Sequence, residues 1–263
     1  MTATPPRDTG VVANEKPLLP EVETLAERFE AAGYLTFSAV SAIHLAHRQS
    51  GLGQGFDRMS IPAGPQRDSL ESLALIEHWI EDAKGLPLFL WWHIFDAHAP
   101  YDLRSPFHGE YWDEGRDPSD PSLPPLPEIA DEIWLKGIHD PAYVETLYRG
   151  EVSYVDAQVA RLLAIPRMAS ALVAFTADHG ESLGAHDIFW DHRELYPEHL
   201  FVPLILAGPG VPAGLRCDAP IEQIDTARTL LDLAGLKETA FPGQNLLRVA
   251  SGELAPTTTR FAL

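Results

Sequence analysis

Apolar and polar positions follow two different rhythms along this chain, and together they predict helices and strands in turn. In residues 21–32, apolar side chains recur at helical spacing, and Gly33 supplies a C-terminal stop. Residues 34–40 are rich in β-branched and aromatic side chains and predict a strand. This helix-then-strand unit is the first of several.

The same unit recurs downstream. Residues 68–84 predict a helix with Asp68 as its N-cap, and residues 88–95 form the nearly continuous apolar run of a parallel strand covered on both faces. The alternation indicates an α/β fold with an open, mostly parallel sheet flanked by helices. The remaining predicted elements are a helix over 141–164, strands over 171–176 and 202–207 (the latter buried), and a helix over 226–234 capped by Asp225.

The segments around these elements set the expected domain organisation. Residues 1–19 are polar and proline-rich and predict an extended segment, 20–248 form one α/β domain, and 249–263 form a C-terminal tail. Residues 105–133 interrupt the pattern with many prolines and acidic side chains. We expect this stretch to be a surface excursion at the rim of a ligand site.

Charge and cysteine content exclude several classes of function. The formal net charge is −19, with 38 acidic against 19 basic side chains, so the chain repels phosphate backbones and nucleic acid is not an expected partner. No apolar run is long enough to cross a bilayer, and Met1–Arg7 lacks the features of a secretory signal, so we expect no membrane partner and a cytoplasmic location. Cys217 is the only cysteine, which rules out an internal disulfide and a cysteine zinc cluster.

Polar side chains follow the ends of the predicted strands, where open α/β sheets bind their ligands. Asp96 and His98 come directly after the strand 88–95. Asp178 and His179 come just past the strand 171–176, and His192 lies in the loop before the strand 202–207. We therefore expect these side chains to gather at one edge of the sheet.

The residue types indicate a chemistry. Asp178 and His179 offer oxygen and nitrogen donors that suit a divalent cation completed by substrate oxygens, and Gly180 lets the backbone turn sharply beside them. His98 and His192 can hydrogen-bond an anionic ester or protonate a leaving oxygen. These residues by themselves predict only a cleft with a metal and histidines.

Structural roles compete with each of these assignments. On spacing alone, the Asp178-His179 pair is equally well explained as the cap of a following helix. For Asp96 we favour a turn or capping role. His186 and His199 can equally be surface residues or ligands. For Asp156 we favour a polar-face residue or a buried anchor of its helix over a catalytic role.

Eight segments, in order, resemble successive blocks of type I sulfatases of the alkaline phosphatase superfamily. The most specific is Phe175-Thr-Ala-Asp-His-Gly-Glu181, and His98-Ala-Pro-Tyr101 and Tyr148-Arg-Gly-Glu-Val-Ser-Tyr-Val-Asp156 support it. The resemblance covers residues 20–235. Its blocks lie at residues 24–27, 32–34, 53–57, 98–101, 148–156, 175–184, 202–210 and 224–231.

The resemblance implies an alkaline-phosphatase-like fold and hydrolysis of small-molecule or glycan sulfate esters. It implies one divalent cation, most often Ca²⁺, with Mn²⁺ or Zn²⁺ as alternatives. Asp178 and His179 match two of its ligands, and His98 and His192 match residues that contact the ester. The oligomeric state stays open.

The chain also departs from the family pattern, and these departures bear on its activity. The family nucleophile is a formylglycine made from a Cys/Ser-x-Pro-x-Arg motif, and neither this motif nor the early Asp-Asp pair occurs in the sequence. Residues 7–17 resemble the segment just after the nucleophile in the family, so we expect a chain truncated at its N-terminus, without the first strand of the sheet. Such a chain is expected to be inactive or impaired. The alternatives are a phosphoester or phosphonate hydrolase of the same superfamily, and a non-catalytic pseudoenzyme or binding subunit.

Overall fold

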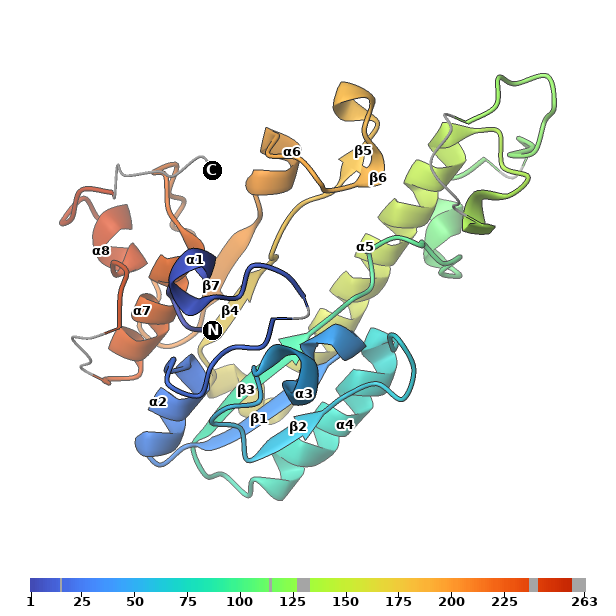
Figure 1. Ribbon diagram of the computed structural model, residues 1–263. Helices are drawn as coiled ribbons and strands as arrows, with labels where there is room; N and C mark the ends of the chain where they lie inside the picture. Colours follow the sequence, from blue (N-terminus) through green and yellow to red (C-terminus); the bar gives the residue numbers. More distant parts are fainter. Residues whose placement is uncertain (15, 114, 127–132, 237–240, 257–263) are drawn as a thin grey trace.

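A parallel three-stranded sheet lies at the centre of the first half of the chain (Figure 1). The computed structural model describes residues 1–14, 16–113, 115–126, 133–236 and 241–256. The strands β1 (Leu35–Val40), β2 (Arg58–Ser60) and β3 (Leu88–His93) lie in the order β2-β1-β3, with Leu35 opposite Leu88 and Phe37 opposite Arg58. The central strand β1 is therefore paired on both sides.

Helices cover both faces of this sheet: α4 (Ser69–Asp82) and α5 (Pro141–Leu163) lie on one face, and α2 (Leu25–Ala31) on the other. On one face, Leu73 and Ile76 of α4 pack with Ala39 of β1 and Leu162 of α5, and β3 adds Leu88, Leu90 and Trp92. On the other face, Phe29 of α2 stacks on Phe89 of β3 with ring centroids 4.5 Å apart. The helices are α1 (Pro6–Thr9), α2 (Leu25–Ala31), α3 (His47–Ser50), α4 (Ser69–Asp82), α5 (Pro141–Leu163), α6 (Pro197–Leu200), α7 (Gln223–Leu233) and α8 (Leu246–Ala250).

The second half contains two antiparallel strand pairs. In one, β4 (Val173–Thr176) pairs with β7 (Leu204–Ala207); in the other, β5 (Ser182–Leu183) pairs with β6 (Phe189–Asp191). Within the described residues, β3 pairs only with β1 and β4 only with β7, so the strands form three separate sheets. Among the described residues, β2 and β3 each therefore have one edge without a strand partner.

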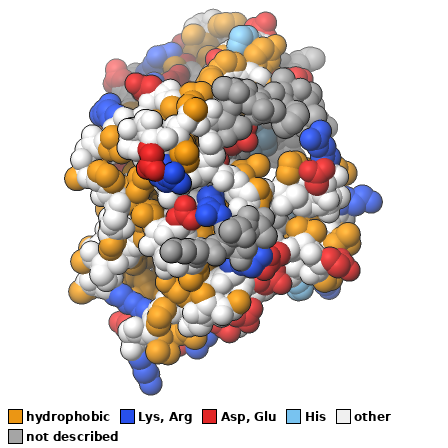
Figure 2. All heavy atoms as spheres, turned by 90° about the vertical axis from the view of Figure 1, so that its left-hand side faces the viewer, with side chains coloured by type: hydrophobic (Ala, Val, Ile, Leu, Met, Phe, Trp, Pro, Cys, Tyr) orange, Lys and Arg blue, Asp and Glu red, His pale blue; other side chains and the backbone are white. Residues whose placement is uncertain are grey.

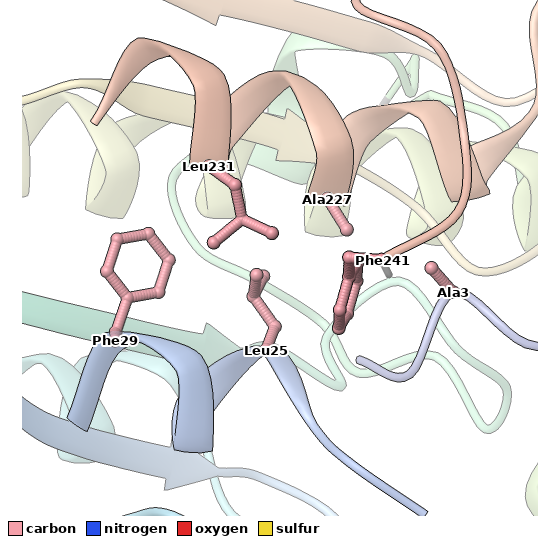
Figure 3. Packing of buried hydrophobic residues seen from close by; sticks show 6 residues of the cluster. All are labelled: Ala3, Leu25, Phe29, Ala227, Leu231 and Phe241. Carbon is pink, nitrogen blue, oxygen red and sulfur yellow. The ribbon is translucent and has the colours of Figure 1, made fainter. Parts of the chain in front are cut away.

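A second core joins the two halves. Leu25 and Phe29 of α2 face Ala227 and Leu231 of α7, with Phe241 and Ala3 at the side of the cluster (Figure 3). On the α7 and α8 side of the molecule, acidic and basic side chains are interspersed with apolar ones (Figure 2).

The predicted α/β architecture, with a parallel sheet flanked by helices, is confirmed. Three details differ. The segment 1–19 is not extended throughout, because Pro6–Thr9 form a helical turn. The strand predicted over 202–207 is not buried, because alternate residues of β7 face solvent and Ile205 is 58% exposed. Asp225 does not cap α7 from outside: it lies within the first turn, where it accepts a hydrogen bond from the backbone of Glu222.

Short 3₁₀ helices lie in several connections, and one of them, η2, lies in the predicted excursion over 105–133. Residues 114 and 127–132 of that excursion lie outside the described residues, as do 257–263 of the predicted tail. Among the described residues, no helix has both the length and the apolar character of a membrane span. The 3₁₀ helices are η1 (Ile43–Leu45), η2 (Phe107–Glu110), η3 (Ile133–Leu135), η4 (Pro166–Ser170) and η5 (Ala185–Asp187).

Candidate active site

Three separate segments bring three histidines together. His98 lies in the irregular segment that follows β3, His179 follows β4, and His192 follows β6. Each segment leaves the end of a strand, as the sheet rule predicts. All three residues are predicted from the sequence, and the structure gathers them in one cluster.

The three imidazoles are close enough to share a ligand. The ring centroid of His192 lies 3.8 Å from that of His179 and 5.2 Å from that of His98, and the His98 and His179 centroids are 6.2 Å apart. One nitrogen of each ring lies within 4.8 Å of one nitrogen of each of the others. The histidine cluster (His98, His179 and His192) is therefore a candidate binding site for a metal ion or an anionic group.

Backbone carbonyls fix the tautomer of two of these rings. His98 Nδ1 lies 2.6 Å from the carbonyl oxygen of Ala99, and His179 Nδ1 lies 2.9 Å from that of Gly180. A carbonyl oxygen only accepts, so Nδ1 carries the proton in each ring. In the neutral ring the lone pair is then on Nε2, which is the atom available to a cation or an ester.

Asp178 brings a carboxylate to the edge of the cluster. Its Oδ1 lies 3.8 Å from Nε2 of His179, and its side chain is 77% exposed. The side chain of Gln223, in α7, donates a hydrogen bond of 2.6 Å to the carbonyl of Ala177 and so ties this loop to α7. Asp178 and His179 thus present an oxygen and a nitrogen donor side by side, which fits the donor set of a divalent cation.

A buried glutamate lies behind His192. Glu181 Oε1 is 3.5 Å from His192 Nδ1, and the Glu181 side chain is only 6% exposed. Burial raises the pKa of Glu181, while burial and the nearby His179 lower the pKa of His192. No role was predicted for Glu181 from the sequence, although its place directly after Asp178-His179-Gly180 was a usable signal.

Two further histidines border the site and were also missed. His44 lies in η1, just past β1, and His93 ends β3. Burial lowers the pKa of both, to about 4 in His93, and the charge of Asp178 acts in the opposite direction on each. Both residues lie at carboxyl ends of parallel strands, so the rule that located His98 applies to them as well.

Structural contacts account for the other candidates, but His199 is buried and is not a surface residue. Asp96 accepts a hydrogen bond of 2.9 Å from the backbone N–H of Ser69, the first residue of α4, and its other oxygen pairs with Arg104 at 2.8 Å. Asp156 is exposed on α5. His186 stacks on Tyr196 away from the histidine cluster, and buried His199 has its Nδ1 2.5 Å from the carbonyl of Glu194.

Comparison with known proteins identifies the family and the fold. The sequence matches the family described as Sulfatase over residues 1–236. A sulfatase of Formosa agariphila is 31% identical over 119 residues, which are 44% of this chain and 23% of that protein. The matched stretch is thus about a quarter of the length of that relative.

The fold is shared with several solved structures. The phosphonate monoester hydrolase SpPMH from Silicibacter pomeroyi superposes with a TM-score of 0.73 at 19% identity, covering 99% of this chain and 67% of that one. BT4656, solved in complex with its substrate D-glucosamine-2-N,6-O-disulfate, superposes with a TM-score of 0.71 at 18% identity, covering 98% of this chain and 70% of that one. From the family match over 1–236, the chain belongs to the Sulfatase family.

Proposed function

We propose that this protein binds a divalent cation through Asp178 and His179 and presents His98 and His192 to a sulfate ester. The observation that carries the proposal is the convergence of three imidazoles within 4.8 Å, with the Asp178 carboxylate 3.8 Å from one of them. Ca²⁺ is the proposed ion, because the family resemblance implies it. Zn²⁺ and Mn²⁺ are the alternatives, because imidazole donors also suit them.

The chain's own residues would each do a separate task. A bound cation supplies positive charge against the sulfate oxygens. His98 and His192 each have one ring nitrogen in the cluster, where a protonated imidazole can donate to the leaving alcohol oxygen. Burial and the neighbouring His179 lower the pKa of His192 and favour its neutral form. A bound anionic ester would add negative charge nearby and raise this pKa.

Turnover needs a nucleophile as well. The resemblance places it in a Cys/Ser-x-Pro-x-Arg motif, which this sequence does not contain. We therefore propose a hydrolase site that binds cation and ester, with turnover by this chain weak or absent. The ester is of a small molecule or a glycan; BT4656, with the same fold, has a sulfated amino sugar as its substrate.

Titration calorimetry with Ca²⁺, Mn²⁺ and Zn²⁺ tests the cation site. Asp178→Ala should weaken binding of the preferred ion by about tenfold or more, because it removes a charged donor. The matched control is Asp156→Ala, which removes an exposed carboxylate on α5 outside the site and should leave the affinity unchanged. A wild-type chain that binds none of the three ions, or an Asp178→Ala variant that binds as well as wild type, contradicts the proposal.

A phosphonate or phosphate ester is the second candidate substrate, because phosphonate monoester hydrolases share the fold. Parallel assays of an aryl sulfate, an aryl phosphate and a phosphonate monoester, each with the preferred ion, separate the two. Turnover of the phosphorus esters alone would reverse the ranking. Intact cation binding with no turnover of any ester and no binding of inorganic sulfate would favour a non-catalytic binding protein.

A further inference from the structure

Glu151 is a buried carboxylate that reaches across the fold to the segment carrying His98. It lies within α5, and only 2% of its surface is exposed. Its Oε2 accepts a hydrogen bond of 2.8 Å from the backbone N–H of Ala97, and its Oε1 accepts one of 3.0 Å from the backbone N–H of Asp102. These two amides bracket His98 on both sides.

The segment between these two amides has no regular secondary structure to hold it. Ala97 adopts a φ of +73°, a left-handed conformation that residues other than glycine rarely take without support from their surroundings. The ring of His98 stacks on Phe95 with centroids 4.3 Å apart. Where the His98 ring points therefore depends on how the backbone of residues 97–102 is held.

Arg104 ties the same glutamate to a second buried carboxylate. Its Nε lies 3.4 Å from Glu151 Oε1, and its terminal nitrogens pair with Asp96 at 2.8 Å and Asp68 at 2.5 Å. One guanidinium thus faces several carboxylates, two of them almost fully buried. Burial raises the pKa of Glu151 to about 7, which means that its charged form is disfavoured where it lies.

A carboxylate buried at such a cost contributes little to stability through its ion pair, since an apolar side chain of similar size often serves as well. Its two backbone hydrogen bonds instead specify a position. We propose that Glu151 is a positioning residue that fixes the 97–102 segment and thereby points His98 into the histidine cluster. The role in ester binding rests on the function proposed for His98; the positioning of the ring does not.

Asp140 offers a matched control on the same helix. It caps α5 by accepting a hydrogen bond of 3.0 Å from the backbone N–H of Ala142, it pairs with Arg116, and its side chain is 2% exposed. Asp140→Asn therefore removes an equally buried carboxylate from α5 without touching either amide beside His98. Any general effect of losing a buried charge should appear in both variants.

The experiment observes the full chain by NMR. In Glu151→Gln, one oxygen is replaced by an NH₂ group that cannot accept, so one of the two backbone hydrogen bonds is lost. Amide hydrogen exchange at Ala97 or Asp102 should rise by about tenfold or more, and the imidazole signals of His98, assigned by their loss in His98→Asn, should move. Asp140→Asn should change neither.

Glu151→Asp is the second variant. It keeps the charge but is shorter by one methylene, so it cannot reach both amides, and an intermediate effect is expected. A folded Glu151→Gln protein with unchanged His98 signals and unchanged exchange overturns the proposal. So does a chain that fails to fold with either substitution, because Glu151 would then serve stability rather than position.

Inorganic sulfate, titrated in the presence of Ca²⁺, separates this inference from the proposed function. The His98 signals of the wild type should respond to sulfate, and the affinity should fall about tenfold in Glu151→Gln. If the His98 signals of the wild type do not change with sulfate, the proposed ester site is contradicted. The His98 signals and the exchange rates of the Glu151 variants still test the positioning role of Glu151. If sulfate binds to the wild type, and Glu151→Gln changes neither the sulfate affinity nor the His98 signals nor the amide exchange, the inference about Glu151 is contradicted. The proposed function then stands.

Discussion

The β2-β1-β3 sheet and the β4-β7 pair both contain apolar strands, but the central strand β1 is more deeply buried than β7. In β1, five of the six residues are buried, and Leu73 of α4, which packs against this strand, is fully buried. In the other pair, alternate residues of β7 face solvent, and Phe201, just before it, is 77% exposed. We therefore expect apolar burial around β1 to contribute more to stability than apolar burial around β7.

The candidate site draws on both regions. His98 leaves the well-packed sheet, whereas Asp178, His179 and His192 come from the strands of the second half. Regions with few buried apolar contacts open locally more easily than the core does. The two halves of the site are therefore expected to differ in rigidity, and substitutions in each region can sharpen or break this comparison.

The largest contrast should come from removing apolar side chains in each region. Leu73→Ala leaves a cavity between α4 and β1 and should lower the free energy of unfolding by about 4 kcal/mol. Ile205→Ala, on the exposed side of β7, should change it by less than about 0.5 kcal/mol. Urea denaturation measures both; a cost at Ile205 as large as that at Leu73 would show that the second region is no less essential to the core.

Acid should act on the first region through His93. Its pKa falls from 6.5 to about 4 on folding, so below pH 6.5 the unfolded chain binds a proton that the folded chain does not. Stability should then decrease by about 3 kcal/mol as pH falls from 6.5 to 4.

In His93→Asn, whose side-chain oxygen can still accept from the backbone of Ser41 as Nδ1 does, this part of the pH dependence should disappear. Denaturation midpoints across the pH range measure it. His78→Asn is the control, because His78 is 69% exposed on α4 and should leave the profile unchanged. Identical profiles for wild type and His93→Asn would contradict the expectation.

The smallest effect concerns a surface contact within the first region. Arg161 of α5 forms two hydrogen bonds of 2.7 Å to the carboxylate of Glu77 in α4. The pair is partly exposed, so Arg161→Ala should cost less than about 1 kcal/mol, and high salt should reduce even that difference. A larger, salt-independent loss would mean that packing of the Arg161 stem, rather than its charge, holds α4 against α5.

Much of the fold could be predicted from the sequence, because helical spacing and apolar runs are local signals. The long helix α5 and the strands β1 and β3 lie close to their predicted bounds. The prediction that β7 is buried was wrong. Residues 202–207 have the composition of a core strand, but among the described strands β7 pairs only with β4. An apolar run indicates that a strand can be buried, but it does not indicate whether another strand or helix covers it.

The site was predictable to a similar extent. His98 and His179 were found because the carboxyl ends of strands are a general location for ligands. His192 was found from the loop before the predicted strand 202–207 and from the family resemblance. Glu151 was missed, because its partners lie 49 and 54 residues away and no local pattern connects them. Contacts of this kind depend on how α5 crosses the sheet, which the order of elements alone does not specify.

Gly180 ties the Asp178-His179 loop to a neighbouring segment, and this tie has an evolutionary consequence. Its N–H donates a hydrogen bond of 2.8 Å to the carbonyl of His199, and a Cβ at this position would lie 1.9 Å from the carbonyl oxygen of Glu198. Any larger residue would collide with the backbone there, and a change of rotamer cannot relieve a backbone clash. Lineages of this sequence can therefore alter Gly180 only if the path of the chain at 198–199 shifts at the same time.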